Sequence, residues 1–129
     1  MFSRSSSSPR ARWRLPPPEV RVLLDECVPE ILRTKFVRHD VETVRFRGWK
    51  GETNGRLIAL ALEAGFHAIV TADRFLYPDH KVSAAGLRVI VLTTNRLRLL
   101  AEAVPAIEEL IDTTPVGTTA VLDPLPGGG

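Results

Sequence analysis

The sequence predicts an α/β fold, a three-layer α/β/α sandwich around a mostly parallel sheet of four to five strands. Short apolar runs such as 20–24 and 87–92, rich in β-branched residues, are typical of buried parallel strands. These runs alternate with stretches of helical apolar spacing, which predicts right-handed βαβ connections. The 129 residues are 44% hydrophobic, which is enough for the core of a single domain.

The elements can be placed in order along the chain. The expected strands are short apolar or alternating runs: 20–24, 40–44, 67–72, 87–92 and 120–122. The expected helices show helical apolar spacing behind a cap or a first-turn proline: 30–37, 54–64, 95–104 and 105–111. Asn54 and Asn95 are the expected N-caps of two of them, and Gly65 ends the second helix. Irregular loops are expected at 45–53 and 74–81, and the alternating second strand is expected near a sheet edge.

The two ends of the chain differ in composition from the middle. Residues 1–18 hold four arginines, five serines and four prolines but no acid, which predicts a disordered basic tail. Such a tail is either an arm for nucleic acid or an acidic partner, or an upstream segment without a role. We expect the folded domain at 19–123 and a flexible tail at 124–129. The single cysteine, Cys27, fits a reducing cytoplasm, and no apolar run approaches the ~18 residues of a membrane span.

Acidic residues follow two of the predicted strands. Asp25 and Glu26 come directly after the first strand, and Asp73 follows the third. Ligand sites of open α/β sheets lie beyond the carboxyl ends of the strands, so these acids fall where a site is expected. With the amide oxygen of Asn54 they form a set of hard oxygen donors that suits Mg²⁺ or Mn²⁺. Alone, Asp25 could cap a helix and Asp73 could begin a turn; as a pair they favour a metal site.

A basic loop lies between the two acidic positions. Its positive residues are Arg45, Arg47, Lys50 and Arg56. Phe46 and Trp49 lie among them, and basic residues interleaved with aromatic ones suit RNA through phosphate contacts and base stacking. The alternatives are a solvated loop whose aromatic rings pack on the core, or a Trp49 that anchors a partner protein.

Three short segments together resemble the PIN-like nuclease superfamily, in particular the VapC-type toxins of bacterial toxin–antitoxin pairs. The segments are Val22-Leu23-Leu24-Asp25-Glu26, Gly51-Glu52-Thr53-Asn54-Gly55 and Val70-Thr71-Ala72-Asp73-Arg74. The first acid of the family falls on Asp25, the T-x-D motif on Thr71 and Asp73, and the helix-opening acid on Asn54.

The resemblance implies a Mg²⁺-dependent endoribonuclease that works with a cognate antitoxin and forms a homodimer. Asp25 and Asp73 would hold the metal, with help from Asn54 and Glu26. The basic loop and Thr71 would contact the RNA.

Two departures from the family pattern leave alternatives open. Asn54 is neutral, and Phe75 stands where relatives carry a second acid in their T-x-D-x-D motif. The chain is therefore either an active nuclease or a catalytically impaired PIN-like module that binds a protein partner or RNA. A receiver-like domain phosphorylated at a strand-end aspartate is a third alternative, although no lysine follows the strand 87–92.

Overall fold

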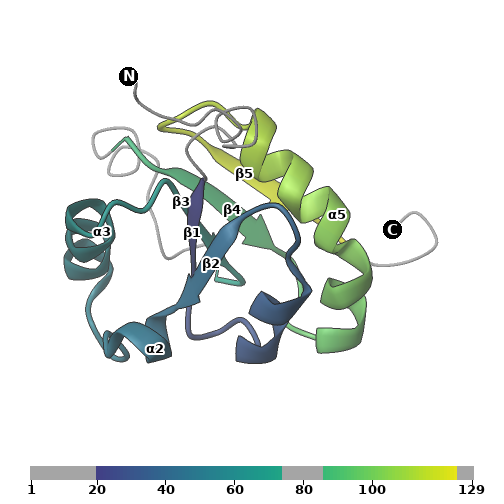
Figure 1. Ribbon diagram of the computed structural model, residues 1–129, viewed down its shortest axis with the longest axis horizontal. Coiled ribbons are helices and arrows are strands. Elements are labelled where there is room, and N and C mark those ends of the chain that lie inside the picture. Colours follow the sequence, from purple (N-terminus) through teal and green to yellow (C-terminus); the bar gives the residue numbers. More distant parts are fainter. Residues whose placement is uncertain (1–19, 74–85, 125–129) are drawn as a thin grey trace, which may run out of the picture.

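A five-stranded parallel sheet forms the centre of the molecule (Figure 1). The computed structural model describes residues 20–73 and 86–124, so the predicted tail 1–18, the loop at 74–81 and residues 125–129 lie outside the described part. The strands are β1 (Arg21–Leu24), β2 (Asp40–Thr43), β3 (Ala68–Thr71), β4 (Arg88–Leu92) and β5 (Thr119–Leu122). Their order across the sheet is β2-β1-β3-β4-β5, and every neighbouring pair is parallel. The predicted α/β class is confirmed, with β2 and β5 at the edges.

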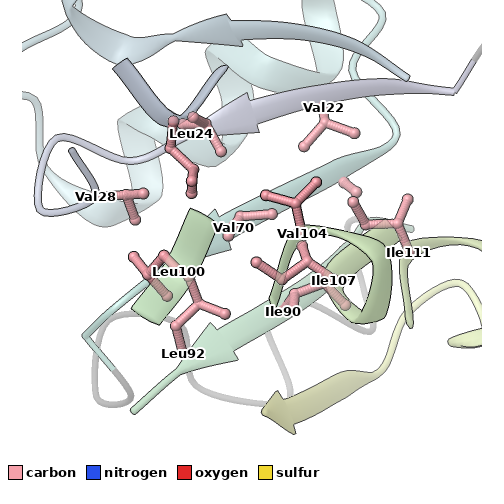
Figure 2. Close-up of a cluster of buried hydrophobic side chains, with 12 residues drawn as sticks. Val22, Leu24, Val28, Val70, Ile90, Leu92, Leu100, Val104, Ile107 and Ile111 are labelled. Atoms are coloured by element: carbon pink, nitrogen blue, oxygen red, sulfur yellow. The ribbon is translucent and has the colours of Figure 1, made fainter. Parts of the chain in front are cut away.

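Helices cover both faces of the sheet, because alternate strand residues point to opposite sides. One apolar cluster joins Leu24 and Val70 to the 3₁₀ helix η1 (Glu30–Lys35) and to α5 (Leu97–Thr113). Figure 2 shows its strand side chains pointing toward those of α5: Leu100, Val104, Ile107 and Ile111. The other cluster joins Leu23 and Ile69 to α2 (Val44–Arg47) and α3 (Asn54–Glu63). Figure 1 shows α2 and α3 on one side of the sheet and α5 on the other.

The connections that carry η1 and α5 have opposite hands. The β1–β2 connection passes through η1, and the β4–β5 connection passes through α5. Both helices pack on the same face and contact each other, yet the two connections step toward opposite edges of the sheet. One of them therefore departs from the right-handed rule on which the sequence-based expectation relied.

Three local elements differ from the expectation. The helix expected at 30–37 is a six-residue 3₁₀ helix that ends at Lys35. The expected loop begins with the short helix α2, because the Thr43 hydroxyl caps it by accepting the Phe46 amide proton at 2.9 Å. Thr53, and not Asn54, caps α3 by accepting the Arg56 amide proton at 3.3 Å. Asn54 is the first residue of that helix.

The two helices expected at 95–104 and 105–111 are one helix, α5, with Pro105 inside it. Its apolar side chains stay on one face across the proline, so their burial holds the helix together where the local signal predicts a break. Arg96 is the N-cap position and makes no side-chain cap, so the cap predicted at Asn95 is wrong. No helix in the described ranges is long and apolar enough to cross a membrane.

Candidate functional site

The two acids of the predicted site lie side by side at the carboxyl edge of the sheet. Strands β1 and β3 are neighbours with Leu24 opposite Val70, and the Asp25 amide donates to the Val70 carbonyl at 2.9 Å. The strand order reverses between β1 and β3, because β2 lies to one side of β1 and the later strands lie to the other. In open α/β sheets, ligands bind in the crevice at such a switch point.

Asp25 is held in place by hydrogen bonds to both of its carboxylate oxygens. The side chain is buried, with 6% of the residue exposed. The Thr71 hydroxyl donates to Oδ2 at 2.9 Å, and the Glu26 amide donates to Oδ1 at 2.8 Å. The carboxylate of Asp25 is therefore fixed in orientation before any ligand arrives.

Burial raises the pKa of the Asp25 carboxyl above its usual value. The hydrogen bonds from Thr71 and from the Glu26 amide oppose this rise, while the negative charges of Glu26 and Asp73 add to it. A buried carboxylate beside two further acids is a group that a cation would stabilise.

Thr71 connects the two acids through its hydroxyl and is itself fully buried. Besides donating to Asp25, Oγ1 accepts the Asp73 amide proton at 3.1 Å and lies 3.3 Å from the Cys27 Sγ. These bonds hold the Thr71 hydroxyl against Asp25, and the substrate contact that the resemblance implies for Thr71 stays a prediction. Cys27 Sγ also accepts the Ala72 amide proton at 3.2 Å and so joins the loop after β1 to the end of β3.

Two hollows flank Asp25, Glu26 and Cys27, which line both of them. The larger has a volume of about 530 Å³, and its wall includes Arg45 and Lys50. The smaller has a volume of about 200 Å³, and its wall includes Asp73 and Trp49. The acids therefore stand between a larger hollow with basic residues in its wall and a smaller one with an aromatic wall.

Glu26 is exposed and joins the acidic edge to the loop before α3. Its Oε1 accepts the Gly51 amide proton at 3.0 Å. This contact places the loop that carries Trp49 and Lys50 beside the acids, and Glu26 is close enough to raise the pKa of Asp25.

The four predicted RNA-binding cations do not form one group. Arg45 and Lys50 line the larger hollow, and Arg45 also lies 3.5 Å from the Glu30 carboxylate. Arg47 instead pairs with Glu42 at 2.6 Å and lies over the rings of Trp49 and Phe66.

Arg56 is exposed in the first turn of α3 and lines neither of the two hollows. Trp49 packs edge-on against Phe66, as the core-packing alternative expects, whereas Phe46 is 73% exposed and does not pack on the core.

Several further residues lie at this edge, and two of them, Glu30 and Thr43, have no individual signal in the sequence. Glu30, Thr43 and Asn95 line the larger hollow, and Thr43 donates to the Glu30 carboxylate at 3.0 Å. A further strand-end acid, Asp123, follows β5 and accepts from the Thr93 hydroxyl at 3.0 Å. The rule that selected Asp25 and Asp73 also applies to Asp123, because the strand expected at 120–122 already ends at Leu122.

The oxygen donors at this edge suit a metal ion that needs few protein ligands. Among the described residues, no three His, Cys, Asp or Glu side chains form a group that could hold one. The side chain of Asn54 and all of Phe75 lie outside the described part. Mg²⁺ keeps several of its waters and is usually bound through one or two carboxylates plus substrate phosphates, so the pair Asp25 and Asp73 fits it without a third acid.

Comparisons with known proteins identified no similar protein. A scan against protein-family models, a search of curated proteins and a search of solved structures each returned no match. The site defines a parallel α/β protein with an acidic crevice at its switch point.

Proposed function

We propose that this chain is a metal-dependent endoribonuclease that uses Mg²⁺ or Mn²⁺ and serves as the toxin of a toxin–antitoxin pair. The observation that carries the proposal is the buried, doubly hydrogen-bonded Asp25 beside Asp73 at the switch point of the sheet. Asp25 and Asp73 would hold the metal through their carboxylate oxygens. A bound ion would activate water and offset the negative charge that develops on a phosphodiester.

Other residues of the chain would position the metal-binding carboxylate and hold the RNA. Thr71 and the Glu26 amide orient the carboxylate of Asp25, a residue that lines both hollows. Arg45 and Lys50 line the larger hollow and would hold the RNA backbone there by phosphate contacts. An antitoxin would inhibit by covering the acidic edge.

The nuclease proposal is tested with purified protein, cellular RNA, and Mg²⁺ or Mn²⁺. We expect cleavage that is lost on chelation and in both Asp25→Asn and Asp73→Asn. Glu63→Gln is the matched control, because Glu63 is an exposed acid on α3 away from the crevice. The proposal fails if the wild type cuts no RNA, or if both aspartate variants cut like the wild type. The toxin role additionally requires that expression of the wild type, but not of Asp25→Asn, arrests growth.

A catalytically impaired module that binds RNA or a protein partner is the second candidate. The absence of a three-acid group among the described residues favours it, as does the neutral Asn54. RNA binding that is lost in Arg45→Ala and Lys50→Ala, without metal-dependent cleavage by the wild type, would select this candidate.

A further inference from the structure

The smaller of the two hollows has an aromatic side chain and several hydrogen-bond acceptors in its wall. Its volume is about 200 Å³. Drug-sized ligands fill about 300 Å³ or more, so this hollow has the size for one ring system and not for a whole nucleotide. Its polar side chains, among the described residues, are the carboxylates of Asp25, Glu26, Glu52 and Asp73 and the thiol of Cys27.

A tight turn brings Trp49 and Glu52 to this hollow. The Glu52 amide donates to the Trp49 carbonyl at 3.2 Å, and Gly51 between them has a φ of 85°. A positive φ at the third residue of such a turn favours glycine. The Gly51 amide also donates to Oε1 of Glu26 at 3.0 Å, which attaches the turn to the acidic edge. Trp49 and Glu52 are therefore beside the acids before any ligand binds.

Trp49 supplies a fixed aromatic surface in the wall of the hollow. Its ring is half-buried and packs edge-on against Phe66, with the ring centroids 6.2 Å apart. The Arg47 guanidinium lies over the Trp49 ring, 5.3 Å from its centroid, so the opposite face is the one left for a ligand. Stacking on an aromatic side chain is a common way to bind an unpaired nucleobase, and it accepts every base.

The carboxylates of the hollow decide which base fits. An ionised carboxylate only accepts hydrogen bonds, and its two oxygens can accept from a pair of parallel N–H groups. Asp25 and Asp73 would hold the metal, and Glu26 already accepts the Gly51 amide proton. The carboxylate of Glu52 is exposed and makes no hydrogen bond or ion pair within the part of the chain that the structure describes. Glu52 is thus the carboxylate that is available to a base.

Guanine is the RNA base whose edge matches a carboxylate. Its N1–H and its 2-amino group are neighbouring donors, which can bind the two oxygens together. Adenine and cytosine each place an amino group beside a ring nitrogen that accepts, and uracil places its single N–H between two carbonyl oxygens. In these three bases an acceptor would face the carboxylate, which binds them less well.

We propose that the smaller hollow binds one unpaired guanine of an RNA strand, stacked on Trp49 and hydrogen-bonded to Glu52. The substrate is then single-stranded RNA, because Glu52 occupies the edge with which guanine forms a base pair. The position of cleavage rests on the proposed nuclease function. Asp25 and Asp73 line the same hollow, so we expect the phosphodiester next to the bound guanine to be the one that is cut.

The test follows the indole signal of Trp49 by NMR in the whole chain while mononucleotides are added with Mg²⁺. Trp13→Phe identifies the signal, because Trp13 is the other tryptophan of the chain. We expect GMP to bind about tenfold more tightly than AMP, CMP or UMP, since a matched bidentate pair discriminates by at least that factor. Inosine monophosphate (IMP) keeps N1–H but lacks the 2-amino group, so its affinity should lie between those of GMP and AMP.

The variant Glu52→Gln replaces one acceptor oxygen by a donor and should bring the affinities for GMP and IMP together. Glu63→Gln, on the exposed surface of α3, is the matched control and should keep the wild-type order. The proposal is overturned if the wild type binds GMP no more tightly than AMP, or if Glu52→Gln still prefers GMP to IMP. The wild-type comparison of GMP, IMP and AMP decides the question if Glu52→Gln does not fold.

Mapping the cleavage sites separates this proposal from the nuclease proposal. Metal-dependent cuts that ignore unpaired guanines, without a preference for GMP, overturn the guanine site and leave the nuclease in place. A preference for GMP that Glu52→Gln removes, without any cleavage by the wild type, supports the guanine site and overturns the nuclease.

Discussion

Removing the Thr71 hydroxyl tests whether it holds the acidic crevice together. Thr71→Val keeps the shape of the side chain but deletes the donor to Asp25 and the acceptor of the Asp73 amide. A hydrogen bond to a charged group contributes about 1.5–3 kcal/mol, and a neutral one about 1 kcal/mol. Because the hydroxyl is fully buried, water does not replace it. We expect the free energy of unfolding to fall by about 2–4 kcal/mol, measured by urea denaturation at neutral pH.

Thr71→Ser is the matched control, because it keeps the hydroxyl and loses one methyl group, at about 1 kcal/mol. Thr71→Val should also raise the pKa of Asp25 further, since the Thr71 bond is the first of the effects that lower it. Binding of Mn²⁺ should then require a higher pH in Thr71→Val than in Thr71→Ser. The role given to the Thr71 hydroxyl is refuted if the free energy of unfolding of Thr71→Val lies within about 0.5 kcal/mol of the wild-type value. It is also refuted if Thr71→Ser lowers the free energy of unfolding as much as Thr71→Val does.

Three further predictions concern the rest of the fold. Asp25→Asn should raise the free energy of unfolding of the metal-free protein at neutral pH. Folding raises the pKa of Asp25, so ionised Asp25 destabilises the folded state once the pH exceeds the unfolded pKa. The stabilisation by Asp25→Asn should therefore vanish in acid, where Asp25 is protonated in both states. A variant equally stable or less stable at neutral pH contradicts this. Pro105→Ala should raise the free energy of unfolding by up to about 3 kcal/mol, measured by urea denaturation, because Pro105 is exposed inside α5 and has no amide N–H to donate. An unchanged free energy of unfolding would show that α5 accommodates the proline without cost. Arg47→Ala should lower the free energy of unfolding by about 1 kcal/mol, because Arg47 loses its contacts with Glu42 and Trp49, and should leave RNA affinity unchanged. Arg45→Ala should weaken RNA binding, because Arg45 lines the larger hollow. A filter-binding assay in which Arg47→Ala weakens RNA binding more than Arg45→Ala contradicts these roles.

The strands were predictable because the apolar pattern that identifies each one lies within its own short segment. Val22, Leu24 and Val70 are buried β-branched or leucine residues in short runs, and burial on both faces requires such runs. The proximity of Asp25 to Asp73 followed from the strands, since parallel neighbours end at the same edge. These expectations needed no knowledge of distant contacts.

The expectations that failed depend on partners far away in the sequence. Pro105 breaks a helix by local criteria, but the apolar face of α5 is buried on the sheet on both sides of it.

The all-parallel ladder described above has a kinetic consequence. Arg21 pairs with Asp40, Val22 with Ala68 and Val89 with Thr119, so even consecutive strands pair through residues about 20 or more positions apart in the chain. Each ladder must close a long loop before it gains any contact, and folds dominated by such distant pairings fold slowly. The acidic edge exists only after β1 and β3 have met. A newly made chain therefore carries no assembled crevice until most of the sheet-forming sequence has left the ribosome.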